Sequence, residues 1–496
     1  MLRRIILLFS LILIIQCKEP EIIEWNSLIN DYSKDDRDSL KLKSVLFLRN
    51  KFESRYSEKL LFMDKKNNRI KIRIDSIQNE ATLMKYMQIN KLESSVIKIK
   101  ESEILNTKDI RRFIEEAVSS RERYSWSKGV SEDLFLKYVL PYKIEMEFPT
   151  EWRSYFERIQ QGFLDSLDRT TDNSIENAAK LISKNIYQWY RYDKSNYLFS
   201  QQPDFNELLF SRKGECYRIA RLFVYALRSA GIPATVDIVP KWGSKNAGHA
   251  EFVLLDSSGN LKANVTTEHK QGLCRASKVF RQNFSYSGLY TDSISPYLRN
   301  YPFKLDHFIN DNTTDVTNEH TTCYDIKFNI PDKYSSSPFL YICVYNYGAW
   351  EPIFWSKNNN NIASFRKMTT NILYRIASPT ENGIELLPNI LFVTNKGEVQ
   401  NIDHIYLKKK SKFHIIKINK FNDGERAHVE SEKLYTLNLL LSNGEWKKLE
   451  SKYPKNGRLS FRIIHSPNSF YKLTGENSID YLARPFQYVN NKIIWW

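Results

Sequence analysis

Residues 213–233 read KGECYRIARLFVYALRSAGIP and specify the fold of the central part of the chain. The spacing predicts one amphipathic helix whose apolar stripe consists of Ile219, Leu222, Phe223, Ala226, Leu227 and Ala230. Gly231 and Pro233 supply the helix stop. Cys216 therefore lies at the helix N-terminus, where the macrodipole and unpaired N–H groups lower the pKa of a thiol and favour a nucleophilic thiolate. From this stretch alone, a structural cysteine in the first turn fits equally well.

A pair of strands is predicted directly after this helix. Residues 234–239 read as one strand, and His249 begins a second one that ends in turn residues at Asp256. With a two-residue turn, the return strand over residues 261–265 places Asn264 opposite His249, and a four-residue turn leaves the two diagonal and still within reach. A histidine oriented by an amide, beside a cysteine at a helix start, is the arrangement of Cys-His-Asn enzymes. Asp256 competes as third member, although its position favours a role in the turn.

Three motifs resemble the core of the transglutaminase-like superfamily: Gly214-Glu215-Cys216, residues 227–234 (LRSAGIPA) and Gly248-His249-Ala250. The resemblance implies a papain-like α+β core. It also implies that Cys216 is the nucleophile, that His249 is the general base and acid, and that Asn264 takes the place usually held by Asp. Besides this amide, Glu251-Phe252 depart from the family pattern, in which Trp-Asn is common after His-Ala.

An oxyanion hole is also expected next to the nucleophile. The backbone N–H of Cys216 would be one donor, and Trp189 or Gln202 upstream is a candidate for the second.

Segments outside the core resemble bacterial surface lipoproteins that carry such a core between a helical N-terminal region and C-terminal β domains. These segments are residues 36–50, 140–142, 152–153, 315–317, 341–350 and 484–486. The resemblance implies a fold and a nucleophile, and leaves the substrate open.

The beginning of the chain is typical of an export signal. Arg3 and Arg4 precede an apolar run over residues 5–15, which is too short to cross a bilayer as a helix. Cys17 follows and resembles the acylated cysteine of a bacterial lipobox, although Gln16 replaces the usual small residue. We therefore expect a lipoprotein-type signal peptide over residues 1–17 and lipidation at Cys17, which anchors the protein in the cell envelope, at the outer membrane. An uncleaved signal anchor is the alternative.

The charge and the cysteine content indicate whether the protein binds nucleic acid or a metal. The chain has 73 Lys and Arg against 57 Asp and Glu, but no motif that reads nucleic acid accompanies this excess, so no nucleic-acid partner is expected. The five cysteines form no CxxC pair and no zinc-ligand spacing, and His269 near Cys274 is too small a set to bind a metal. No metal or other cofactor is expected.

The 496 residues predict an α+β multidomain protein. A mainly helical N-terminal region over residues 18–160 has helical stripes at 40–48 and 110–117 and an exposed strand within 65–75. The papain/transglutaminase-like core is expected over 161–315. Antiparallel β-sandwich-like domains follow over 316–415 and 416–496, where short aromatic and β-branched runs alternate with turn residues. Aromatic residues of the first β domain form either a sugar-binding platform or its core: Tyr341, Tyr345, Tyr347, Trp350, Phe354 and Trp355.

Two functions remain open on these grounds. The first is cysteine-dependent acyl transfer on amide or peptide bonds of a peptide, protein or glycopeptide substrate, through a Cys216 thioester. Hydrolysis is then expected over cross-linking, because cross-linking requires a site that favours an amine over water. The alternative is a catalytically inactive lipoprotein that binds a glycan or peptide through its β domains.

Overall fold

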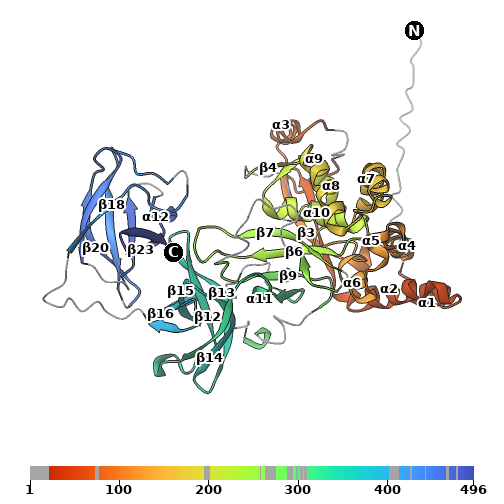
Figure 1. Ribbon diagram of the computed structural model, residues 1–496. Helices are drawn as coiled ribbons and strands as arrows, with labels where there is room; N and C mark the ends of the chain where they lie inside the picture. Colours follow the sequence, from red (N-terminus) through yellow and green to blue (C-terminus); the bar gives the residue numbers. More distant parts are fainter. Residues whose placement is uncertain are drawn as a thin grey trace, which may run out of the picture.

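The computed structural model describes residues 22–72, 77–194, 202–256, 258–262, 275–286, 294–297, 300–301, 305, 310–401, 413–424, 427–441, 443–464, 469–475 and 479–496. The helices and the central sheet pack together on one side of the molecule, and two β modules follow them in sequence (Figure 1). In these ranges no helix is both long and apolar enough to span a bilayer. Seven residues named above lie outside the described residues: Arg3, Arg4, Gln16, Cys17, Asn264, His269 and Cys274.

The N-terminal region combines helices with a small antiparallel sheet. Its helices are α1 (Trp25–Tyr32), α2 (Ser39–Arg49), α3 (Glu80–Asn90), α4 (Thr107–Arg123), α5 (Ser125–Lys128) and α6 (Glu132–Tyr138). Ile110, Phe113 and Ile114 of α4 are buried, as their spacing predicts. The sheet has the order β2-β1-β3 and consists of β1 (Tyr56–Met63), β2 (Arg69–Ile70) and β3 (Glu93–Lys100).

The expected strand within residues 65–75 is described as a strand only at Arg69–Ile70, and the two longer strands were not expected. β3 is largely exposed and pairs with β1 along its whole length, so it has no apolar face that would mark it in the sequence.

The core consists of helices packed on a five-stranded antiparallel sheet with the order β10-β9-β6-β7-β8. Its strands are β6 (Ala234–Val239), β7 (His249–Leu255), β8 (Leu261–Lys262), β9 (Phe280–Gln282) and β10 (Thr313–Asp315), and its helices are α7 (Trp152–Asp168), α8 (Ile175–Tyr187), α9 (Phe205–Ser211) and α10 (Cys216–Ser229). The predicted helix is confirmed as α10. It is buried on every side from Tyr217 to Ser229, so it is the interior helix of the core rather than a surface helix.

The predicted hairpin register after His249 is wrong. A two-residue turn would pair Leu255 with residue 258 and a four-residue turn with residue 260, whereas the structure pairs Leu255 with Leu261. The cause is Asp256, whose carboxylate accepts from the N–H groups of Ser258 and Asn260 at 3.0 and 2.9 Å and so builds a longer turn. Asp256 is therefore a turn residue, as its position indicates.

The C-terminal sheets are antiparallel, as predicted, and are described here as two β modules. The first is a seven-stranded sheet with the order β11-β14-β13-β12-β15-β16-β17. Its strands are β11 (Cys323–Asn329), β12 (Phe339–Asn346), β13 (Ala349–Asn359), β14 (Ile362–Thr369), β15 (Ile372–Thr380), β16 (Gly383–Val393) and β17 (Val399–Asn401), and the short helix α11 (Thr317–His320) precedes them.

The second β module combines a five-stranded sheet, β20-β19-β22-β23-β24, with the pair β18-β21. Its elements are β18 (Phe413–Ile418), β19 (Tyr435–Leu440), β20 (Trp446–Lys452), β21 (Leu459–Ile464), β22 (Tyr471–Gly475), α12 (Ile479–Leu482), β23 (Pro485–Val489) and β24 (Lys492–Trp495). Trp496 returns to the first module, where its ring centroid lies 4.9 Å from that of Phe392 on β16. In Figure 1 the C-terminal end accordingly lies between the two modules.

The aromatic residues of β12 and β13 are core residues. Tyr341, Tyr345, Trp350, Phe354 and Trp355 are all buried. A ring must be exposed on one face to stack on a sugar, so these five rings form no binding platform.

Candidate active site

Cys216 is the first residue of α10 and is half-buried. The two residues before it hold it there. Glu215 caps the helix, because its carboxylate accepts from the N–H groups of Tyr217 and Arg218 at 2.7 and 3.2 Å. A Cβ added to Gly214 would lie 2.6 Å from the Tyr190 hydroxyl and from the Arg218 side chain, so a larger residue would displace the chain. The Gly-Glu-Cys sequence thus places the thiol at the helix start.

The electrostatic setting of the thiol differs from the prediction. Burial raises the pKa of Cys216 and is the largest influence on it. Hydrogen bonds from the backbone amides of Ala250, Tyr217 and Cys216 itself lower the pKa, whereas the Glu215 carboxylate raises it. The helix N-terminus acts in the predicted direction, but burial outweighs it. The net direction of the pKa is therefore upward, opposite to the lowering expected from the helix start alone.

His249 is the first residue of β7 and immediately precedes Ala250, whose amide contacts the Cys216 sulfur. The structure therefore brings the helix start and the beginning of this strand together. The imidazole also lies beside the buried ring of Trp242, with 5.9 Å between the ring centroids. Asn264, the third predicted residue, lies outside the described residues.

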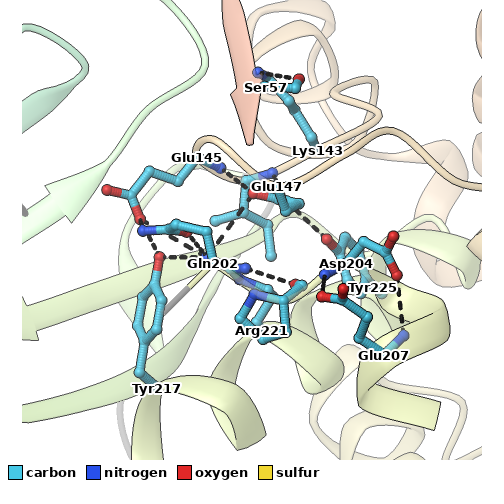
Figure 2. Close-up of polar contacts among 12 residues, drawn as sticks. Ser57, Lys143, Glu145, Glu147, Gln202, Asp204, Glu207, Tyr217, Arg221 and Tyr225 are labelled. Atoms are coloured by element: carbon cyan, nitrogen blue, oxygen red, sulfur yellow. Dashed lines mark hydrogen bonds and ion pairs between the residues drawn. The ribbon is translucent and has the colours of Figure 1, made fainter. Parts of the chain in front are cut away.

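A buried polar network fixes the first two turns of α10 (Figure 2). At its centre is Arg221, which is fully buried and donates to the Tyr217 hydroxyl and the Pro203 carbonyl at 2.7 and 2.8 Å. Glu145 and Glu147 lie 3.8 and 3.9 Å from its guanidinium. Tyr217, the residue directly after Cys216, is thus tied to carboxylates of the N-terminal region.

Glu147 is held as an anion by this network. Burial raises the pKa of Glu147, but Arg221, the Tyr225 hydroxyl at 2.7 Å and the Ile144 amide together bring it below its usual value. An unpaired carboxylate at this depth would instead take up a proton. Arg221 is the largest of the influences that lower this pKa, ahead of Lys143, so the network depends mainly on its central arginine.

Gln202, a candidate oxyanion donor, is part of the same network. Its amide nitrogen donates to Glu145 at 2.7 Å, and its amide oxygen accepts from Arg221. Trp189, the other candidate, packs against the hydrophobic core around α10. The contacts of Gln202 fit a role in positioning the start of α10.

A second buried charged cluster involves β7 itself. Glu251, one of the departures from the family pattern, faces Asp237 of β6 across the strand pair, and burial raises the pKa of Glu251 to about 7. His320 bridges the two carboxylates, with Nε2 2.6 Å from Asp237 and Nδ1 3.8 Å from Glu251. Arg281 donates to both oxygens of Asp237, at 2.9 and 2.8 Å. Glu251 thus belongs to a buried charged cluster that is separate from the network around Arg221.

Sequence reasoning missed the partners that hold α10. Arg221 was visible in the sequence as a charge inside an apolar helical stretch, which is a signal for a buried pair. Nothing local indicates that its partners are Glu145 and Glu147, which precede it by more than 70 residues.

A cysteine at the start of a buried helix, in contact with a histidine-bearing strand of an antiparallel sheet, defines the papain-like class of fold. The family model of the transglutaminase-like superfamily matches residues 162–264, which include Cys216, His249 and Asn264. This part of the chain is a transglutaminase-like core, the domain of a family of cysteine-dependent hydrolases and acyltransferases.

The search of curated proteins found no match. Among solved structures, the chain is similar to a proposed cysteine protease from Cytophaga hutchinsonii, with 18% identity and a TM-score of 0.18. The similar part covers 23% of this chain and 38% of that chain.

Proposed function

We propose that this protein is an envelope-anchored enzyme that cleaves amide or peptide bonds through a thioester on Cys216. His249 is the general base and acid. Asn264 is proposed to orient its imidazole on the resemblance to the family, because the observed start of the hairpin no longer supports a position opposite His249. The observation that carries the proposal is the contact between the Cys216 sulfur and the amide of Ala250, the residue next to His249. This contact supports a nucleophile and base that lie side by side across the helix start and the strand start.

The raised thiol pKa favours general-base catalysis over a preformed thiolate. His249 accepts the thiol proton as Sγ bonds to the substrate carbonyl carbon. It returns that proton to the amine as the C–N bond breaks. Water then attacks the thioester and His249 takes one proton from the water. The C–S bond breaks as His249 returns that proton to Sγ, which releases the acid and restores the thiol. The backbone N–H of Cys216 is one donor to the oxyanion in both steps.

The substrate in this proposal is a peptide, a protein or a glycopeptide, and water is the acceptor. Water reaches a half-buried thiol without a dedicated site, whereas cross-linking requires a second pocket that holds an amine against water. Lipidation at Cys17 would keep the enzyme at the envelope, at the outer membrane, beside such substrates. The basic run, short apolar run and cysteine at residues 3–17 support this anchor.

A panel of peptide, protein and glycopeptide amides, incubated with the purified chain, tests the proposal. Wild type should release amine and carboxylic acid from at least one class, and Cys216→Ala should abolish the release. His249→Ala should slow it by roughly 100-fold or more, which is the usual contribution of a general base. Activity that survives in Cys216→Ala would contradict the thioester route.

Thiol alkylation provides a test that needs no substrate. Iodoacetamide should modify Cys216 faster in wild type than in His249→Ala at pH 7, because the imidazole accepts the thiol proton. Cys323 is the internal control, since it is also half-buried and burial also raises the pKa of its thiol. Equal Cys216 rates in the two proteins would favour the alternative, a binding lipoprotein without turnover.

A further inference from the structure

Residues 240–248, here called the histidine loop, lead from the end of β6 to His249. The loop closes tightly on itself: the Trp242 N–H donates to the Ala247 carbonyl at 3.0 Å. Its two ends almost touch, because a Cβ added to Gly248 would lie 2.4 Å from the Pro240 carbonyl oxygen. The direction in which the chain enters β7, and with it the placement of the His249 side chain, depends on how this loop is held.

The first β module holds the loop through Asn346, the buried last residue of β12. Its amide oxygen accepts from the Ala247 N–H at 3.1 Å. Its amide nitrogen lies 3.2 to 3.4 Å from three loop carbonyls, those of Trp242, Lys245 and Ala247. One side chain thus contacts the loop backbone at three residues.

The second β module holds the same loop through Arg484, which lies between α12 and β23 and is 1% exposed. Arg484 donates to the Gly243 carbonyl of the loop at 2.9 Å, to the Trp496 carbonyl at 2.9 Å, and to the Tyr345 carbonyl of β12. It also lies 3.4 Å from the Asn246 side-chain oxygen. One guanidinium therefore joins the loop to both β modules.

Asn246 completes the set from within the loop. Its side-chain nitrogen donates to the Leu482 carbonyl at 2.9 Å, and its side-chain oxygen accepts from the Tyr347 N–H at 3.0 Å. The loop thus bonds to the end of α12 and to the turn after β12. We call Asn246, Asn346 and Arg484 the loop clamp.

The chemistry of Arg484 is unusual for a residue whose only role is to join domains. Burial lowers its pKa to about 9, and in the described part of the chain no carboxylate lies within ion-pair distance of it. Burying a cation is costly unless its donors are satisfied, and here backbone carbonyls satisfy them. Two of its contacts go to the histidine loop, although an arginine that only stabilised the second module would need neither.

We propose that the loop clamp positions His249, so that the two β modules complete the active site of the core. The proposal rests on the proposed function for the role of His249, but the clamping of the loop stands on the contacts alone. It assigns the β modules a part in catalysis. Asn246, Asn346 and Arg484 act through the loop and are positioning residues.

The test uses the full chain and three variants. Arg484→Lys keeps the positive charge but cannot reach all its acceptors, and Asn246→Ala removes a single side chain from the loop. Asn438→Ala is the matched control. Asn438 is a buried asparagine, whereas Asn246 is half-buried. The Asn438 amide donates to Thr474 at 2.8 Å within the second module, and in the described part of the chain it makes no hydrogen bond to the loop.

Hydrogen exchange measures the clamp itself. Arg484→Lys and Asn246→Ala should speed exchange at the Trp242 and Ala247 amides by about tenfold or more, while the amides of α10 keep their protection. Asn438→Ala should leave the loop amides unchanged. Unchanged loop exchange in both clamp variants would overturn the proposal, whether or not the protein is an enzyme.

The pH profile of Cys216 alkylation measures the effect on the site. Both clamp variants should reproduce the profile of His249→Ala, and Asn438→Ala should keep that of wild type. A wild-type profile in clamp variants whose loop exchanges faster would overturn the positioning role. If His249→Ala itself matched wild type, the proposed function would fail, and the exchange data would still decide whether the clamp holds the loop.

Discussion

The two candidate catalytic residues are positioned by different regions and by different kinds of contact: Cys216 by the N-terminal region and His249 by the C-terminal β modules. The helix that carries Cys216 is tied to the N-terminal region by a buried ionic network of Arg221, Glu145 and Glu147. The loop before His249 is tied to the C-terminal β modules by hydrogen bonds from Arg484 and Asn346 to backbone carbonyls. The first arrangement balances charges, and the second fixes the path of a backbone.

This difference predicts that substitutions in the two regions affect the stability of the protein to different extents. Removing one partner from a buried ionic network leaves an uncompensated charge, which is far more destabilising than losing a neutral hydrogen bond. We therefore expect changes beside α10 to affect global stability. Changes in the loop clamp should act mainly on the geometry of the site.

The largest effect is expected for Arg221→Met. Glu145 and Glu147 would remain buried without their cation, so the free energy of unfolding should fall by roughly 3–5 kcal/mol. Urea unfolding measures the loss. Arg121→Met is the control. In the described part of the chain Arg121 has no carboxylate partner: it donates to the Val130 carbonyl at 3.1 and 2.6 Å and lies over the Phe135 ring, so its loss should cost about 1–2 kcal/mol. Equal losses of unfolding free energy in the two variants would contradict the expected difference between an ionic network and hydrogen bonds to a carbonyl.

The next effect concerns the strand that carries His249. The pKa of Glu251 in the folded protein, about 7, lies above the unfolded value, so its contribution to stability is complete below about pH 4.5 and is lost as the pH rises to 7. The loss is on the order of 3 kcal/mol. Glu251→Gln should flatten this part of the pH dependence, measured by urea unfolding from pH 5 to 8.

Glu385→Gln is the control for this experiment. Glu385 is paired with Lys333 on the surface, and this pair lowers the pKa of Glu385. Its contribution is lost only as the solution becomes more acidic than pH 4.5, so the slope between pH 5 and 8 should remain. A slope that survives in Glu251→Gln would show that another group causes it.

A smaller effect compares two buried tyrosines with different acceptors. The Tyr225 hydroxyl donates to the Glu147 carboxylate at 2.7 Å, whereas the Tyr374 hydroxyl donates to the Thr369 carbonyl at 2.9 Å. Tyr225→Phe should cost roughly 1.5–3 kcal/mol and Tyr374→Phe about 1 kcal/mol, because an ionic acceptor strengthens the bond. Thermal and urea unfolding measure both, and the reverse order would contradict an ionised Glu147.

The smallest effect on stability is expected for Glu215→Gln. The amide retains an oxygen that caps α10, so the loss should stay below about 1 kcal/mol. The pKa of the Cys216 thiol should fall, because the substitution removes the carboxylate charge that raises it. The pH dependence of alkylation measures this shift, and an upward shift would contradict the electrostatic role of Glu215.

The sequence is sufficient to predict elements whose information is local. The bounds of α10 and the starts of β6 and β7 follow from apolar periodicity, Gly231 and the turn at Asp256. The hairpin register cannot be predicted in this way, because one side chain, that of Asp256, determines the length of the turn. The loop clamp is invisible for another reason: Arg484 follows Gly243 by 241 residues, and no periodic pattern connects them.

The separation in sequence between Arg484 and the histidine loop also means that the ribosome adds Arg484 long after the loop. At about 5–20 residues per second, a ribosome needs roughly 10–50 s to add the 241 residues between Gly243 and Arg484. During that interval the chain already contains Cys216 and His249, whereas the loop lacks its arginine. A nascent chain, or one cut by a protease before the second β module, therefore carries Cys216 with an incompletely held His249.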